Sequence, residues 1–147
     1  MTSARRQSQH AAFRVGAVTW TVTGVGHTVL GFFLPSDPEL DAVMRGSEIE
    51  IGPLQLDAES LHRGVSLIMG LAVIVVGALL WMIADTLRTA PDRLRPYGIV
   101  ALVATLLALA IAAVWIPGPP LVTFSVATIA VCTALFAKPA TRVTATH

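Results

Sequence analysis

Four long apolar runs limit the folds that this chain can adopt, and they lie at about 13–34, 60–85, 97–116 and 120–137. A helix of about 20 apolar residues crosses a hydrocarbon core of about 30 Å. Backbone groups inside a bilayer must be paired within the protein, and the runs lack the alternation of barrel strands, so the spans are helices. The composition, with 54% hydrophobic and 13% charged residues, is typical of a membrane protein. We therefore predict a single all-α domain, a four-transmembrane-helix bundle.

Charges are segregated along the chain. Seven of the nine carboxylates lie in the segment 35–59, between the first two runs: Asp37, Glu39, Asp41, Glu48, Glu50, Asp57 and Glu59. Eight of the ten basic residues flank the opposite ends of the runs: Arg5, Arg6, Arg14, Arg88, Arg93, Arg95, Lys138 and Arg142. Cytoplasmic segments are enriched in Lys and Arg, so we predict that both termini are cytoplasmic and that 35–59 is an extracytoplasmic loop. The predicted location is the inner (plasma) membrane, which the chain crosses several times.

The predicted outer loop, 35–59, is long enough to have structure of its own. Ser36, followed by Pro38 and by Glu39 three residues after the serine, is typical of a helix start. We expect a short helix from there through Met44, with Ser36 as its cap.

The rest of the loop contains an alternating segment and a second helix start. Ile49 and Ile51 alternate with glutamates before a Gly-Pro turn, which fits a small strand or an extended segment. Asp57 is the candidate N-cap of the second membrane helix. The polar tails, 1–10 and 139–147, are predicted to be flexible.

Small side chains recur along one side of each run. They are Thr19, Thr23 and Gly31 in the first, with His27 at the same spacing of four, Ser66, Gly70 and Gly77 in the second, Ala104, Ala108 and Ala112 in the third, and Ala127, Ala130 and Ala134 in the fourth. Helices in lipid associate by close packing through small residues. The pattern supports a compact bundle and equally a homo-oligomer.

His27 is an ionisable side chain well inside an apolar run, and such residues usually face the bundle interior and are candidates for function. Three roles stay open. The imidazole could fix helix packing through a hydrogen bond to Thr23, Ser66 or a backbone carbonyl, it could contact a proton or a substrate, or it could ligate haem or a metal. A shared haem requires a second imidazole at similar depth, and His62 lies roughly 10 Å higher at 1.5 Å per residue. We therefore expect no cofactor and keep haem as an alternative.

Polar residues gather at the start of the second run. Glu59 precedes Arg63 by one helical turn, which favours an ion pair, and His62 stands beside Glu59. The group is either a solvated helix start or a binding site for anionic head groups or a polar ligand. The ligand-binding candidates are His27, Asp57, Glu59, His62, Arg63 and Ser66. Their spacing is not that of a dedicated metal site, and no activated nucleophile accompanies them, so no metal ligands and no catalytic residues are predicted.

Two segments resemble an uncharacterised family of small bacterial four-helix membrane proteins. They are Gly24-Val25-Gly26-His27 in the first run and Leu61-His62-Arg63-Gly64-Val65-Ser66-Leu67-Ile68-Met69-Gly70 at the second. Members of that family carry Gly-x-Gly-His in helix one and His/Arg-Gly-x-Ser-Leu-x-x-Gly at the start of helix two. The similarity covers the first two helices by motif and the last two by hydropathy alone. It implies the four-helix fold and a bacterial source, and it implies no activity.

The sequence thus favours a membrane protein that acts as a structural or interaction module. Its expected partners are the lipid bilayer and either another membrane protein or a second copy of itself, and the net charge of +1 gives no reason to expect nucleic acid. The alternative is an outer-leaflet site for a small molecule, quinone, lipid or haem that uses His27, His62 and Arg63. An enzyme acting on a lipid-borne substrate is a third class, which would need a cavity open to that leaflet.

Overall fold

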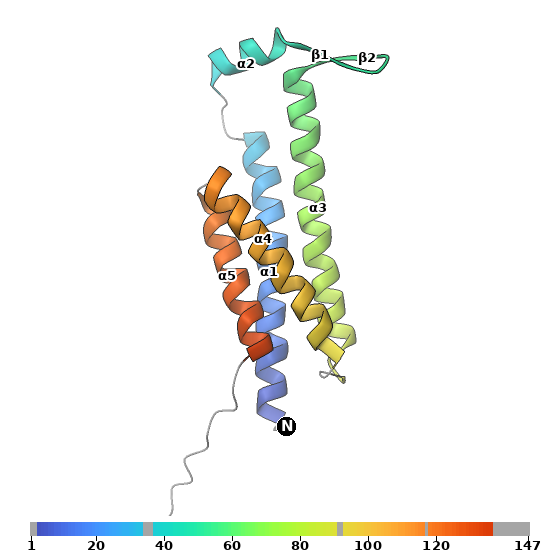
Figure 1. Cartoon of the computed structure of the whole chain (residues 1–147), viewed down its shortest axis with the longest axis vertical. Helices are drawn as coiled ribbons and strands as arrows, with labels where there is room; N and C mark the ends of the chain where they lie inside the picture. The colour runs from blue at the N-terminus through green and yellow to red at the C-terminus, as the bar shows by residue number, and fades with distance from the viewer. Residues whose placement is uncertain (1–2, 34–36, 91–92, 117, 137–147) are drawn as a thin grey trace, which may run out of the picture.

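A computed structural model describes residues 3–33, 37–90, 93–116 and 118–136, and this part of the chain is helical apart from one short hairpin (Figure 1). The helices are α1 (Ser3–Phe33), α2 (Pro38–Arg45), α3 (Ala58–Thr86), α4 (Leu94–Trp115) and α5 (Pro119–Phe136), and the strands are β1 (Glu48–Ile51) and β2 (Leu54–Asp57). The predicted helical class is confirmed. The end of the molecule that carries α2, β1 and β2 is called the capped end below.

The apolar runs correspond to helices that are compatible with a membrane. Three of them, α3, α4 and α5, are long and apolar enough to cross a bilayer, and α1 taken together with α2, which lies at 88° to it, gives a fourth candidate. The bounds of α3, α4 and α5 agree with the predicted runs within three residues.

The start of α1 differs from the prediction, because the helix begins at Ser3 and so includes most of the segment 1–10 that was expected to be flexible. Contacts at and just after the end of this segment hold α1 against the rest of the protein. The Nε2 atom of His10 donates to the carbonyl oxygen of Ala84 over 2.9 Å, and Phe13 is buried. The other predicted flexible tail, 139–147, lies outside the described residues.

The four long helices run in alternating directions, and α1 lies between α3 and α5 (Figure 1). In contrast, α4 packs chiefly against α5 and contacts α3 only weakly. Large apolar side chains such as Ile68, Val100, Val114 and Ile129 are exposed on the outward faces. Such faces are expected where a helix contacts lipid tails.

Small residues spaced by seven allow α1 and α3 to approach closely. They are Ala17, Gly24 and Gly31 on α1, and Gly70, Gly77 and Ala84 on α3. A Cβ atom on Gly24 would lie 2.7 Å from the carbonyl oxygen of Gly70, and one on Gly77 would lie 2.6 Å from the backbone nitrogen of Thr21. Only glycine hydrogens fit at these two contacts, so the predicted small-residue face of the second membrane helix is confirmed.

Threonines of α1 also lie at the contact with α3. The hydroxyl groups of Thr21 and Thr28 lie against Gly77 and Gly70. Thr19 and Thr23 belong to the predicted small-residue face of this helix, and like Thr21 and Thr28 they donate to carbonyl oxygens within α1. Of the predicted face, His27 and Gly31 lie at the contact with α3, next to Ser66.

Apolar clusters fill the space between α1, α4 and α5. In one of them Trp20 packs edge-to-face on Phe124 with ring centroids 5.1 Å apart, next to the buried Ala112 and Ala127. Ala130 and Ala134 are also buried, as the small-residue stripe of the fourth membrane helix predicts. Aromatic rings on one helix thus pack against alanines on its neighbours.

The cap contains the predicted short helix and a strand. The N-cap of α2 is Asp37, whose carboxylate accepts from the backbone N–H of Glu39 over 2.9 Å, and the predicted cap Ser36 lies outside the described residues. β1 and β2 pair antiparallel, with Ile51 opposite Leu54. Gly52 turns the chain between them with φ of 61°, in the left-handed region that favours glycine.

Candidate binding site at the capped end

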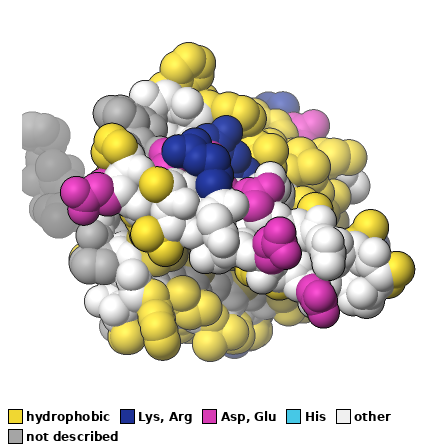
Figure 2. All heavy atoms as spheres, turned by 90° about the horizontal axis from the view of Figure 1, so that it is seen from above, with side chains coloured by type: hydrophobic (Ala, Val, Ile, Leu, Met, Phe, Trp, Pro, Cys, Tyr) yellow, Lys and Arg dark blue, Asp and Glu magenta, His cyan; other side chains and the backbone are white. Residues whose placement is uncertain are grey.

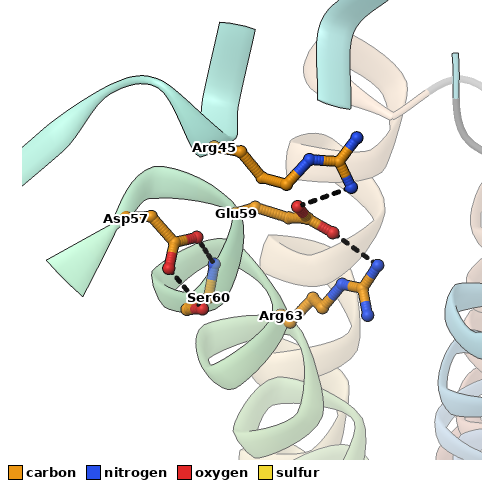
Figure 3. Close-up of polar contacts among 5 residues, drawn as sticks. All are labelled: Arg45, Asp57, Glu59, Ser60 and Arg63. Carbon is orange, nitrogen blue, oxygen red and sulfur yellow. Dashed lines mark hydrogen bonds and ion pairs between the residues drawn. The ribbon is translucent and has the colours of Figure 1, made fainter. Parts of the chain in front are cut away.

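Asp57 is the N-cap of α3, as the sequence predicts. Its carboxylate accepts hydrogen bonds of 2.7 Å from both the backbone N–H and the hydroxyl of Ser60 (Figure 3). The backbone N–H of Ser60, and then its hydroxyl, stabilise the ionised form and lower the pKa of Asp57 below its ordinary value of 3.8. Asp57 is therefore engaged in starting the helix, and it lines neither of the cavities described below.

Glu59 lies between two arginines (Figure 3). Its Oε1 atom is 2.5 Å from Nη2 of Arg63, which confirms the predicted pair one helical turn apart, and its Oε2 atom is 3.4 Å from Nη1 of Arg45 in α2. The side chain of Glu59 is only 12% exposed, whereas those of Arg45 and Arg63 are 59% and 68% exposed. The carboxylate connects α2 to α3, and the three groups together have one positive charge in excess.

The arginine patch, Arg45 and Arg63, is accessible at the surface. Figure 2 shows basic side chains in the middle of the capped end, with acidic side chains at several positions around them. Both guanidinium groups lie on the same side of Glu59, away from Asp57 (Figure 3). Each guanidinium has more N–H donors than its single contact with Glu59 uses.

A first cavity lies beneath the cap between α1, α2 and α3 and has a volume of about 240 Å³. It is called the polar cavity below because charged side chains line it, although most of its surface is apolar. Its polar lining includes Thr28, Asp41, Glu59, His62, Arg63 and Ser66, and its apolar lining includes Phe32, Met44 and Leu67. Three of the predicted binding residues at the start of α3 thus surround one space, together with Ser66.

A second cavity, the apolar cavity, has a volume of about 570 Å³ and lies between α1, α3 and the start of α5. Its lining includes Val22, His27, Leu30, Pro119, Pro120 and Thr123. Three residues, Gly31, His62 and Ser66, line both cavities, so the two spaces adjoin at these residues.

His27 is hydrogen-bonded to Ser66, with 3.0 Å between its Nε2 atom and the hydroxyl oxygen. This confirms one of the predicted partners. The hydroxyls of Thr23 and Thr28 donate within their own helix, whereas the hydrogen bond of Ser66 crosses from α3 to α1. The two segments that carry the family resemblance therefore contact each other.

The imidazole of His27 is exposed and lines the apolar cavity, which differs from the expected position in the bundle interior. Its Nδ1 atom has no hydrogen-bond partner among the residues that the structure describes. His27 lies six residues before the end of α1, about 9 Å below it. In either tautomer, one ring nitrogen thus remains available to a molecule in this cavity.

His27 and His62 differ in height along the helix axes by less than the roughly 10 Å that the sequence indicates. His27 is at the level of Ser66, which lies one turn, about 6 Å, below His62. Among the described residues, no group of three or more His, Cys, Asp or Glu side chains is placed to hold a metal ion. The haem alternative depends on His27 and His62 alone.

Some residues of the site were not predicted. Arg45 is the single basic residue in the acidic loop 35–59, and this isolated charge is a signal that points to an ion pair. No local signal places Pro119 and Pro120 beside His27, because the proline turn reaches the site only through the packing of α5 on α1.

Comparisons with protein-family models, with curated proteins and with solved structures find no significant match to this chain. The resemblance to small bacterial four-helix membrane proteins stays a prediction.

Proposed function

We propose that this chain is a four-span membrane protein that binds an amphipathic small molecule of the lipid or quinone class in the outer leaflet. One observation carries the proposal: a polar cavity and an apolar cavity adjoin at Gly31, His62 and Ser66. A molecule with a polar end and an apolar chain matches this pair of spaces. Of the functions that the sequence allows, the cavities favour an outer-leaflet ligand site over a purely structural module.

The unused nitrogen of His27 supports the proposal. An imidazole nitrogen that is exposed in hydrocarbon without a partner carries a desolvation cost. A bound molecule with a hydroxyl or carbonyl group would provide that partner within the apolar cavity. A module that serves packing alone needs no such open space next to a polar side chain.

The proposed orientation places the capped end outside the cytoplasm. It rests on the segregation of charge, since most basic residues lie near the opposite end of the helices and in the tails. Arg45 and Arg63 then lie at the outer interface, at the level of lipid head groups. The proposed location is the inner membrane, with both termini in the cytoplasm.

Photolabelling tests the binding proposal. The full chain, purified in mild detergent, is irradiated with lipids and a quinone that carry a photoreactive group in the apolar chain, and mass spectrometry locates the labelled residues. We expect labels within 22–31 and 62–66, the segments of α1 and α3 that contribute lining residues to both cavities. Labels spread evenly over the outward faces of α3, α4 and α5 would show boundary lipid only and would refute the proposal.

Two glycine variants make the test specific. The nearest atom to a Cβ on Gly31 is the hydroxyl oxygen of Ser66, 3.9 Å away, and a Cβ on Gly64 meets nothing within 4 Å. Gly31→Leu should fill the junction of the cavities and remove the labels there. Gly64→Leu adds the same side chain outside the two cavities and should leave the labels unchanged.

An absorbance spectrum separates the haem alternative from this proposal. Haem bound through His27 gives a Soret band in the purified protein, and His27→Ala removes that band. A spectrum with the band would replace the lipid or quinone ligand by haem.

A further inference from the structure

We infer that the polar end of the ligand is a phosphate ester, so that the bound molecule is a phospholipid whose phosphate meets Arg63 and His62. This inference depends on the proposed function, because it names the chemistry of the head group held in the polar cavity. A quinone would have no negative charge to place there.

Arg63 is the side chain that would contact the phosphate directly. Its side chain lines the polar cavity and is 68% exposed, and one of its terminal nitrogens contacts Glu59. The remaining N–H donors of the guanidinium are available, and a guanidinium binds phosphate oxygens in a bidentate manner. Ion pairing with Glu59 holds this side chain at the rim of the cavity.

Arg45 adds the positive charge that Glu59 does not neutralise. Two guanidinium groups share one carboxylate, and they lie on the same side of it (Figure 3). Asp41 also lines this cavity, so the two guanidinium groups and the two carboxylates have no net charge, and a phosphate would bind through direct contacts with the guanidinium N–H groups. A simple structural ion pair between α2 and α3 would need only one arginine.

The adjoining apolar cavity favours a phospholipid over free phosphate or a soluble phosphate ester. Inorganic phosphate or a soluble phosphate ester would occupy the polar cavity alone. A phospholipid extends past Gly31 and Ser66 into the apolar cavity, where Val22, Leu30 and Pro119 surround its chain. The shared lining of the two cavities thus favours a phosphate that is attached to an apolar chain.

Asp41 acts against the binding of an anion. Its carboxylate belongs to α2 and lines the same polar cavity as Arg63. Repulsion between this carboxylate and a phosphate weakens binding. Removing the charge of Asp41 should therefore strengthen the binding of a phospholipid. A misfolded variant would bind less, so an increase in binding cannot result from loss of folding.

The test compares two photoreactive lipids with identical acyl chains, phosphatidylglycerol and diacylglycerol, on the purified full chain. With wild-type protein we expect phosphatidylglycerol to label the cavity residues about tenfold more efficiently, the effect of one charged hydrogen-bonded contact. Arg63→Gln should reduce phosphatidylglycerol labelling to the level of diacylglycerol and leave diacylglycerol labelling unchanged. Asp41→Asn should increase phosphatidylglycerol labelling, and Arg88→Gln, which removes an exposed arginine remote from the site, should have no effect.

The possible failures are distinguishable. Equal labelling of the cavities by both lipids, or an equal loss of both labels in Arg63→Gln, would overturn the phosphate inference and leave the binding site in place. Displacement of phosphatidylglycerol by inorganic phosphate at low millimolar concentration would show that a free anion is the ligand. Absence of cavity labels from every lipid and quinone would refute the proposed function itself.

Discussion

The indole N–H of Trp20 in α1 donates a hydrogen bond of 3.2 Å to the hydroxyl of Thr105 in α4. Thr105 is fully buried, and its own hydroxyl hydrogen goes to the carbonyl oxygen of Ala101 over 2.6 Å. Because α4 packs chiefly against α5, this bond adds a polar contact between α4 and the central helix. It helps to fix the rotation of α4 about its own axis.

Thr105→Val should destabilise the protein. Valine keeps the size of the side chain but leaves the indole N–H of Trp20 buried without an acceptor, at a cost of about 1 kcal/mol, as is typical of hydrogen bonds between membrane helices. Denaturation in mixed detergent measures the change. Thr133→Val is the control, since Thr133 is exposed and donates within α5 to Ile129, and an equal effect of both variants would contradict the prediction.

Gly24→Ala should force α1 and α3 apart. The new Cβ would lie 2.7 Å from the carbonyl oxygen of Gly70 and 2.7 Å from the backbone nitrogen of Ile74. Backbone atoms cannot move aside as a flexible side chain can, so we expect a loss of about 1–3 kcal/mol, typical of overpacking. The measurement is the thermal midpoint in detergent.

Gly26→Ala provides the comparison on the same helix two residues later. A Cβ at this position meets nothing within 4 Å, and alanine is the better helix former. This variant should be as stable as the wild type or slightly more stable. A similar loss in both variants would show that the effect does not come from the contact with Gly70.

The cap of α3 should depend on pH through Asp57. Its pKa is lowered in the folded protein, so the ionised cap contributes stability above the ordinary value of 3.8, and this contribution is lost as the pH falls through the lowered pKa. Asp57→Ala should lower the thermal midpoint at about pH 6, and the difference from wild type should shrink near pH 3. A difference that stays constant down to pH 2 would argue against an ionised cap.

The proposed orientation is tested by cysteine labelling. In a Cys132→Ala background, Gly46→Cys places a thiol at the exposed end of α2, and Thr89→Cys places one between α3 and α4 at the opposite end. A membrane-impermeant maleimide should label the first in intact cells and the second only after permeabilisation. The reverse pattern would place the capped end in the cytoplasm.

Local patterns predicted those parts of the fold that depend on neighbouring residues. The apolar runs gave α3, α4 and α5 within three residues, and Asp57 was identified as a cap because its partner Ser60 is only three positions away. The start of α1 at Ser3 was missed, because His10 pairs with Ala84, which is 74 residues distant in the chain. Local composition gives no information about such a contact.

The same distinction applies to the site. His27 and Ser66 were both identified as candidates, and Ser66 was one of the three partners proposed for the imidazole. The contact between Arg45 and Glu59 was not predicted, because it forms only when α2 folds back over the start of α3. The apolar cavity depends further on α5, whose position relative to His27 is set by packing through α1.

The central place of α1 affects how the protein is made. This helix leaves the ribosome first, yet it packs against α3 and α5, and α5 is synthesised last. Each of α3, α4 and α5 is long and apolar enough to cross a membrane by itself. In contrast, α1 meets this criterion of length and hydropathy only when it is taken together with α2. We therefore expect stable insertion of the first segment to await its later neighbours, and a nascent chain truncated before α5 should be a substrate for membrane proteases.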